Sequence, residues 1–259
     1  MRSYPALAGL RIGCVKYLNS KPLIHGYEGD VLFDHPSGLA RDLAAGRLDV
    51  ALVPTFEALR SPHYTLAEGV GIACDGPVYS VFLAHRGPLA ELRRVALDPA
   101  SLTSVHLLQV LLREYHGVRP ELCDLSAFPA ETDAALIIGN QAIDFRQHDQ
   151  EGYQILDLGE EWKRCTGLPF VFAPWLLRPD LPHAAEVAAD LRALKAHGLA
   201  CLDDIIRAEP RDPEFTRRYL TQHIRFELGE REKAGIAKFR ELLAKHGFIA
   251  EAKTALRYA

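Results

Sequence analysis

The sequence lacks the motifs that mark most metal, nucleotide and acyl-transfer enzymes. Its five cysteines are widely spaced and form no Cys-x-x-Cys pair, which favours free thiols in a reducing compartment over disulfides or zinc ligands. The phosphate-loop lysine motif, the His-Glu-x-x-His zinc motif and the Gly-x-Ser-x-Gly nucleophile turn are absent. Gly69-Val70-Gly71 begins like a dinucleotide fingerprint, but Cys74 stands in place of the third glycine. We therefore expect no metal site and no nucleotide cofactor.

An apolar run at the N-terminus and clusters of positive charge are also missing. The 259 residues carry a net charge of −4 and the Lys and Arg residues are scattered, so we expect no nucleic-acid partner. Residues 1–10 hold no apolar run long enough for a signal sequence or a membrane helix. We expect a cytoplasmic protein with no membrane partner, although a chain that had lost its leader would look the same. The eleven histidines are dispersed, and His25, three residues before Glu28, is more typical of a loop than of a metal site.

Two segments repeat one pattern, in which hydroxyl side chains precede an amphipathic helix and a short apolar strand follows. The first runs from Pro36 through a helix ending at Gly46 to a strand at 50–53, and the second runs from Ser101 through a helix to a strand ending at Gly139. A helix N-terminus carries unpaired amides and the positive end of the helix dipole, so it attracts anions. Either segment alone is also compatible with an ordinary α/β unit whose Ser or Thr only caps its helix. Their pairing favours a two-lobed clamp around an anionic ligand.

The order of elements predicts an α/β fold with two lobes, of which the first is discontinuous. A strand at 10–15 ends in the polar loop 16–20, a place where open α/β sheets bind ligands. Everything after Pro182 has helical periodicity. Two chain crossings permit hinge motion around a ligand. The predicted lobes are residues 1–91 plus 171–259, with the C-terminal helices, and residues 92–170.

Small neutral polar residues gather in the loops that this arrangement brings together. Neutral donors hold a carboxylate without burying a counter-charge. These residues alone therefore predict a small anionic organic ligand and leave both an enzyme and a receptor open. The candidate residues are Asn19, Ser20, Ser37, Gly38, Ser80, Thr103, Ser104, Gly139 and Asn140.

Six segments, taken in order, carry a resemblance to a known family: Tyr17–Leu23, Pro36–Ala40, Leu48–Pro54, Asp75–Ser80, Asp157–Ala173 and Ile224–Phe239. Together they resemble chorismate dehydratase of the futalosine route to menaquinone. The resemblance implies a fold similar to type II periplasmic binding proteins, with two lobes, a mixed sheet flanked by helices in each, and a ligand cleft between them. It also implies a cytoplasmic carbon-oxygen lyase that dehydrates chorismate to 3-[(1-carboxyvinyl)oxy]benzoate without metal or organic cofactor. An oligomer stays possible.

Asn19 is the candidate catalytic residue, orienting the substrate or the departing hydroxyl. The substrate's own side-chain carboxylate is a candidate base, because the matched motifs offer no obvious histidine or acidic residue. The other candidate residues would contact the substrate. Two positions depart from the family pattern, since Lys16 is charged and Asn140 stands where an aspartate often occurs.

Two other functions stay open. The first is 1,4-dihydroxy-6-naphthoate synthase of the same pathway, although that enzyme carries a Ser-Pro-Cys-Pro-Asn-Asp-type loop where this chain has Lys16–Ser20. The second is a non-catalytic protein that binds a small carboxylate, because a clamp needs no catalysis. The sensing domain of a transcription regulator would need an attached helix-turn-helix, and only about ten residues precede the first strand.

Overall fold

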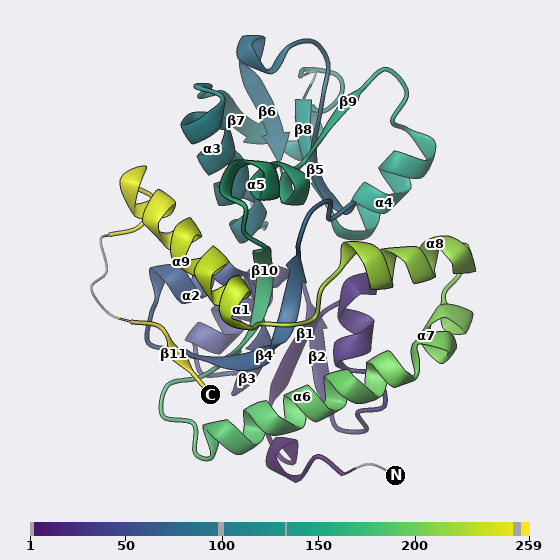
Figure 1. The fold of residues 1–259 in the computed structure, drawn as a ribbon, viewed down its shortest axis with the longest axis vertical. Coiled ribbons are helices and arrows are strands. Elements are labelled where there is room, and N and C mark those ends of the chain that lie inside the picture. Colours follow the sequence, from purple (N-terminus) through teal and green to yellow (C-terminus); the bar gives the residue numbers. More distant parts are fainter. Residues whose placement is uncertain (1–2, 98–100, 133, 251–254) are drawn as a thin grey trace.

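The computed structural model describes residues 3–97, 101–132, 134–250 and 255–259, which form two stacked lobes (Figure 1). The first lobe is built on a six-stranded sheet with the order β11-β4-β10-β3-β1-β2. Strands β1, β2 and β3 are parallel, whereas β10 runs antiparallel to β3 and β4, so the sheet is mixed. Its strands are β1 Ile12–Val15, β2 Val31–Asp34, β3 Val50–Leu52, β4 Thr65–Cys74, β10 Phe170–Leu177 and β11 Arg257–Tyr258.

The second lobe is built on a five-stranded sheet with the order β7-β6-β8-β5-β9. Strand β5 pairs antiparallel with β8 and β9, and β6 pairs parallel with β7 and β8, so this sheet is mixed as well. Its strands are β5 Val81–His85, β6 Arg94–Leu97, β7 Glu121–Asp124, β8 Ala134–Ile138 and β9 Gln154–Asp157.

The chain changes sheets earlier than the sequence suggested. We predicted the first crossing between residues 91 and 92, but β5 pairs with β8 in full register from Val81 to His85. The crossing therefore lies between Cys74, where β4 ends, and Val81. An apolar strand alone carries no sign of its pairing partner, which explains the error. The chain returns to the six-stranded sheet with β10, which begins at Phe170.

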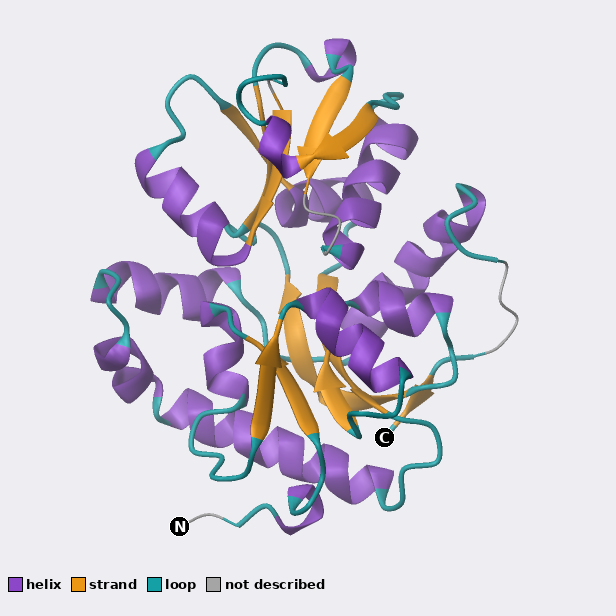
Figure 2. Ribbon diagram, turned by 180° about the vertical axis from the view of Figure 1, so that it is seen from behind, coloured by secondary structure: helices purple, strands orange, loops and turns teal. Residues whose placement is uncertain are grey.

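Helices flank both sheets (Figure 2). They are α1 Pro36–Ala44, α2 Thr55–Arg60, α3 Leu102–Tyr115, α4 Gly139–His148, α5 Leu158–Thr166, α6 Ala184–Ala200, α7 Leu202–Ala208, α8 Pro213–Arg218 and α9 Glu230–Lys245. Shorter turns are the 3-10 segments η1 Pro5–Leu7, η2 Leu18–Leu23, η3 Leu89–Glu91 and η4 Leu125–Ala127, and the π-helical turn η5 Tyr219–His223.

Helix α6 supports the loop that follows β1. Gly198 lies inside α6, where a Cβ atom would stand 1.9 Å from the carbonyl oxygen of Pro22 in η2. Only glycine permits this approach of the helix backbone to the loop. The long helix thereby fixes the position of η2, and with it Asn19.

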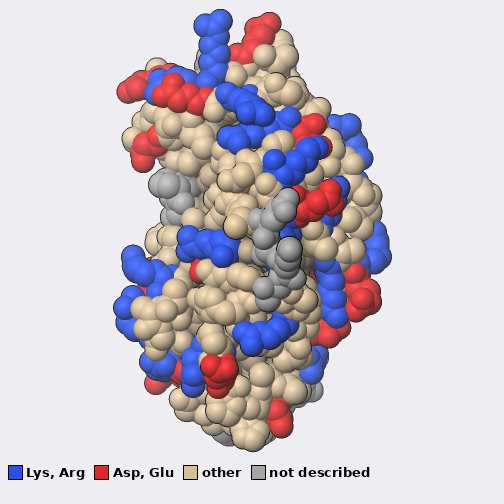
Figure 3. Space-filling view, turned by 90° about the vertical axis from the view of Figure 1, so that its left-hand side faces the viewer, with Lys and Arg blue, Asp and Glu red and all other residues tan. Residues whose placement is uncertain are grey.

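One apolar core extends through both lobes. It runs from β1, whose four residues are all buried, to the inner face of α3 and the fully buried Trp162 of α5. A smaller cluster around Phe82 covers the other face of the five-stranded sheet. No helix among the described residues is long and apolar enough to cross a membrane. On the face shown in Figure 3, basic and acidic side chains are interspersed.

Candidate functional site

A pocket lies where the two lobes meet. The first lobe lines it with the end of β1, the loop after β1 and the middle of β10, and the second lobe adds the first residues of α3 and α4. Its walls are largely apolar, for example Val15, Ile72 and Phe172. Among the described residues that line it, none is an acid, a histidine, a lysine or an arginine. Its polar lining is Tyr17, Asn19, Ser80, Ser101, Thr103 and Ser104.

Three buried polar side chains meet beside this pocket. Asn19 and Ser80 line it at 8% and 0% exposure, and the hydroxyl of Ser80 lies 2.7 Å from the phenol oxygen of Tyr219. Burial raises the pKa of the Tyr219 phenol well above its usual range, although hydrogen bonds from Ser80 and Asn19 lower it in part. The phenol is therefore neutral at physiological pH and links the other two side chains. We call Asn19, Ser80 and Tyr219 the polar cluster.

Asn19 keeps hydrogen-bonding capacity for a ligand. Its side chain lowers the pKa of the Tyr219 phenol, and its carbonyl oxygen Oδ1 is buried with no hydrogen-bond partner among the described residues. A carboxamide offers two N–H donors and one acceptor oxygen. One donor and the oxygen thus stay available. A buried acceptor without a partner is costly, so its presence in a pocket indicates a ligand-binding role.

The first turn of α3 supplies the hydroxyl residues that we predicted as caps, but they act differently. Ser101 occupies the N-cap position without a side-chain cap bond. The hydroxyl of Thr103 accepts a hydrogen bond from the amide of Phe56 in α2, at 3.1 Å, and so joins the lobes. The backbone ladder of α3 starts with the bond from Val105 N to Ser101 O, at 3.0 Å. The amides before Val105 precede this ladder and favour an anion in the pocket.

The N-terminus of α1 differs from the prediction. Its N-cap is His35, and Ser37 is a half-buried residue of the first turn that does not line the pocket. The neighbouring Asp34 accepts a bond from the amide of His35, at 2.7 Å, and a Cβ atom at Gly38 would stand 2.1 Å from its carboxylate. A carboxylate of the protein itself therefore occupies this helix end, which makes Ser37 and Gly38 poor candidates for binding an anion.

The second helix N-terminus at the pocket is that of α4. Ile138 and Gly139 line the pocket, and the amide of Gly139 donates to the carbonyl of Ser80, at 2.8 Å. Gly139 has a φ of +63°, and a Cβ atom there would lie 2.8 Å from the Tyr17 ring of the first lobe. Asn140 does not line the pocket, because its carbonyl oxygen accepts a bond from the amide of Leu18, at 3.2 Å. Both residues thus hold α4 against η2.

Two further residues serve the loops rather than the pocket surface. Ser20 donates its hydroxyl to the carbonyl of Val15, at 2.6 Å, and tightens the turn that presents Asn19. Asp157 accepts bonds from the amides of Val78 and Tyr79, at 3.0 and 2.7 Å, and so fixes the segment before Ser80. Sequence analysis did not single out Asp157, although an aspartate before a helix is a recognisable cap.

Comparison with known proteins gives one family and two kinds of relative. A family model described as menaquinone biosynthesis matches residues 10–245. A chorismate dehydratase of Thermus thermophilus is 33% identical over 90% of this chain and 94% of its own, and one of Campylobacter jejuni is 26% identical over 86% and 88%. A 1,4-dihydroxy-6-naphtoate synthase of Streptomyces coelicolor is 28% identical over 75% of this chain and 68% of its own.

Solved structures show the fold. A protein of Archaeoglobus fulgidus superposes with a TM-score of 0.74 at 17% identity, over 93% of this chain and 98% of its own. The periplasmic aliphatic sulphonate binding protein SsuA of Escherichia coli superposes with a TM-score of 0.63 at 16% identity, over 93% and 88%. The predicted fold, similar to type II periplasmic binding proteins with two mixed sheets, is confirmed.

Proposed function

Because this chain belongs to the menaquinone biosynthesis family, we propose that it is a chorismate dehydratase, as two of its relatives are named. The reaction removes water from chorismate and leaves 3-[(1-carboxyvinyl)oxy]benzoate. The observation that carries the proposal is the buried neutral polar cluster, Asn19, Ser80 and Tyr219, beside two helix N-termini in a pocket whose described lining has no charged side chain. An enzyme with this substrate is expected in the cytoplasm.

The pocket suits a small cyclic dicarboxylate. The first turns of α3 and α4 both reach it and turn the positive ends of their helix dipoles toward it, and at α3 the amides before Val105 can also bind a carboxylate. Apolar side chains such as Val15 and Phe172 are suited to the faces of the ring. Ser104, 6% exposed, is a second hydroxyl donor at the α3 end. These donors carry no charge, so they would leave the negative charge of the two carboxylates uncompensated in the ground state.

The chemistry follows from the substrate and these donors. A proton leaves the ring carbon that bears the enolpyruvyl ether, and the electron pair spreads through the ring alkene into the ring carboxylate. The pair then forms a ring double bond as the neighbouring carbon loses hydroxide, which combines with the proton as water. The new double bond completes the aromatic ring and supplies driving force. Donors fixed on the ring carboxylate stabilise the charge of the intermediate.

Asn19 would act on the departing hydroxyl group. Its unpartnered Oδ1 can accept from the hydroxyl in the ground state, and its remaining N–H can donate as negative charge grows on that oxygen. The described lining provides no carboxylate or imidazole as a base. The side-chain carboxylate of chorismate itself is placed to take the proton, because it hangs from the ether oxygen on the same ring carbon.

The test is incubation of the purified protein with chorismate, followed by proton NMR of the mixture. The proposal predicts an aromatic product with an intact carboxyvinyl group, formed in equal amount to the chorismate consumed and still formed with a chelator present. Unchanged chorismate at catalytic protein concentration would overturn the proposal.

Two alternatives are separated by the same experiment. The relative from Streptomyces coelicolor favours 1,4-dihydroxy-6-naphthoate synthase, and for such an enzyme chorismate would neither bind nor react. The likeness to a sulphonate binding protein favours a carboxylate-binding protein, for which calorimetry would show binding of chorismate without turnover.

A further inference from the structure

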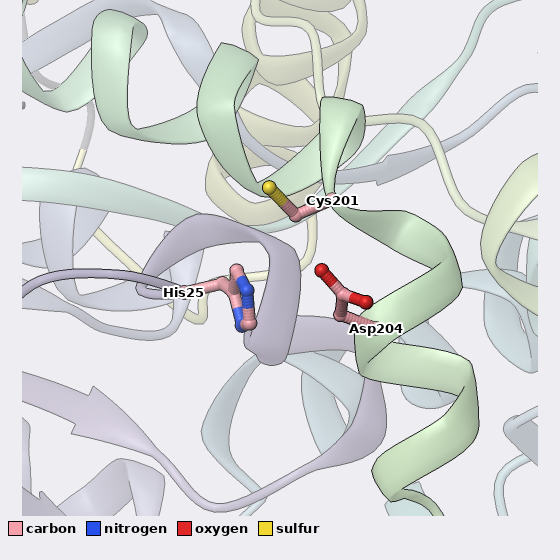
Figure 4. Close-up of side chains that lie close together, drawn as sticks. All are labelled: His25, Cys201 and Asp204. Carbon is pink, nitrogen blue, oxygen red and sulfur yellow. The ribbon is translucent and has the colours of Figure 1, made fainter.

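A histidine, a cysteine and an aspartate converge outside the pocket, where the loop after η2 meets the corner between α6 and α7 (Figure 4). His25 follows η2, Cys201 is the residue between the two helices, and Asp204 lies in the first turn of α7. Their ligand atoms, one from each side chain, all lie within 4.8 Å of one another. Among the described residues, no other group of three or more His, Cys, Asp or Glu side chains has its ligand atoms this close together.

A fourth potential ligand stands beside them. His197 precedes Cys201 by one helical turn, and its ring nitrogens lie 3.7 and 3.9 Å from the Cys201 sulfur. Its ring centroid is 6.0 Å from that of His25. The ring packs against Gly26, where a Cβ atom would be 2.7 Å away. Rotation of His197 about its own side-chain bonds completes a set of two imidazoles, one thiolate and one carboxylate.

This donor set is typical of zinc. Zinc takes sulfur, nitrogen and oxygen ligands in a tetrahedron with bonds of about 2.0–2.3 Å, so its ligand atoms stand about 3.3–3.8 Å apart. The largest spacing in the protein exceeds this by about 1.0–1.5 Å, a gap that side-chain rotation closes. The carboxylate of Asp204 currently pairs with Arg207 at 2.8 Å, and both side chains are mostly exposed, so this ion pair is weak and replaceable. We propose that His25, His197, Cys201 and Asp204 form a zinc-binding site.

The metal would fasten the loop that presents Asn19. His25 comes two residues after η2, and the other three ligands belong to the α6–α7 corner against which η2 packs. None of the four lines the pocket, so the metal would position the loop and take no part in the chemistry. The sequence does not reveal the site, because His25 is separated from the other ligands by more than 170 residues, and the proposal departs from our expectation of no metal site.

The first experiment uses cobalt as a spectroscopic substitute for zinc. One equivalent of Co²⁺ added to the metal-free protein should give the visible bands of tetrahedral cobalt together with a near-ultraviolet band from thiolate coordination. Cys201→Ser should abolish the thiolate band and weaken cobalt binding by at least ~100-fold, more than the loss of a residue that only supports a ligand. His25→Ala should weaken binding in a similar way, which keeps the test valid if one variant fails to fold.

Cys165→Ser is the matched control. Cys165 is also a partly buried thiol near an acid and a histidine, since its sulfur is 3.5 Å from Glu161, which His116 contacts at 2.7 Å. That carboxylate is already paired with Arg164. The thiolate band should therefore persist in Cys165→Ser. A wild-type protein without the band, a band that survives Cys201→Ser, or a band lost in Cys165→Ser would each overturn the proposal.

A second measurement reports the effect on the loop. Zinc at about 100 times its Kd should raise the Tm of the wild type by about 5–10 °C and leave that of Cys201→Ser unchanged. Equal shifts in both proteins would contradict the site. The zinc site is tested by cobalt spectra and by the Tm, whereas the dehydratase proposal on which the role of the loop rests is tested by the aromatic product, so failure of one and failure of the other give different results.

Discussion

Replacement of Tyr219 by phenylalanine removes one oxygen atom from the centre of the polar cluster. The ring stays, packed in the core at 1% exposure beside Phe215, so the fold is expected to survive. What is lost is the hydroxyl that lies 2.7 Å from that of Ser80 and whose pKa is lowered by the Asn19 side chain. Two buried polar groups are then left with one partner fewer.

The expected effect is larger on turnover than on binding. Each orphaned buried group costs about 1–3 kcal/mol, so the free energy of unfolding falls by a few kcal/mol. A catalytic donor displaced by about 1 Å loses up to a hundredfold in rate. We therefore expect the rate of chorismate dehydration to fall about 10- to 100-fold, an increase of roughly 1.4–2.8 kcal/mol in the barrier. The Kd of chorismate should change by less than about threefold, since the helix N-termini that bind its carboxylates are unaltered.

The assay is single-turnover dehydration under excess enzyme, with the Kd from calorimetry on the same preparation. Tyr64→Phe is the matched control, because Tyr64 is also 1% exposed and its hydroxyl has no hydrogen-bond partner among the described residues. That variant should dehydrate chorismate at the wild-type rate. Unfolding by denaturant shows whether each variant is folded under the assay conditions.

Combination with Asn19→Ala shows whether Tyr219 acts through Asn19. If it does, the double variant should be barely slower than Asn19→Ala alone, since residues that share a partner are not additive. Fully additive losses, or a Tyr219→Phe variant with wild-type turnover, would refute the positioning role.

Three other changes test separate parts of the structure. Thr103→Ala with Ser104→Ala should raise the Kd of chorismate about tenfold, or 1.4 kcal/mol, in a protein that stays folded; unchanged affinity by calorimetry would remove α3 from the site. Gly139→Ala should lower the free energy of unfolding by about 1–3 kcal/mol and slow turnover, because its φ is +63° and the Tyr17 ring is in contact. Gly117 also has a positive φ, +68°, but a Cβ atom there would meet open space. Gly117→Ala should therefore be more stable than Gly139→Ala, and equal stability of the two variants would show that the contact with the Tyr17 ring is unimportant. Hydrogen bonds from Arg11 hold the pKa of Asp49 far below its usual range, so the ionised form stabilises the fold above the unfolded pKa of about 3.9. Asp49→Asn should therefore cost about 1–3 kcal/mol at pH 7, with a difference that shrinks as the pH falls below about 4, and a difference independent of pH would contradict this assignment.

Much of the fold was predictable because its signals are local. The strand that ends at Val15 and the helix that ends before Gly46, a glycine with positive φ, were predicted from an apolar run and from a glycine after a helix. The pairing of β5 was not, because it depends on contacts with β8 and β9 that leave no mark in an isolated apolar segment. The role of Gly198 was not predictable for the same reason, since its small size serves a contact with Pro22, far away in sequence.

The candidate site was predictable in part. Loops at strand ends and helix starts pointed to Asn19, Ser80 and Thr103, which the structure places around one pocket. Tyr219 was missed, because it lies in an irregular π-helical turn of a segment that reads as helical core and its partner Ser80 is 139 residues away. Ser37 was overvalued, because nothing in the sequence pattern shows that Asp34 already occupies that helix end.

The most direct measurement of the central claim compares Asn19→Ala with the wild type in single-turnover dehydration of chorismate, beside the Kd for the same two proteins. If Asn19 assists departure of the hydroxyl, the rate should fall by about 100-fold or more while the Kd stays within about threefold. A variant that dehydrates chorismate at nearly the wild-type rate, or one whose rate and affinity fall together, would contradict the account.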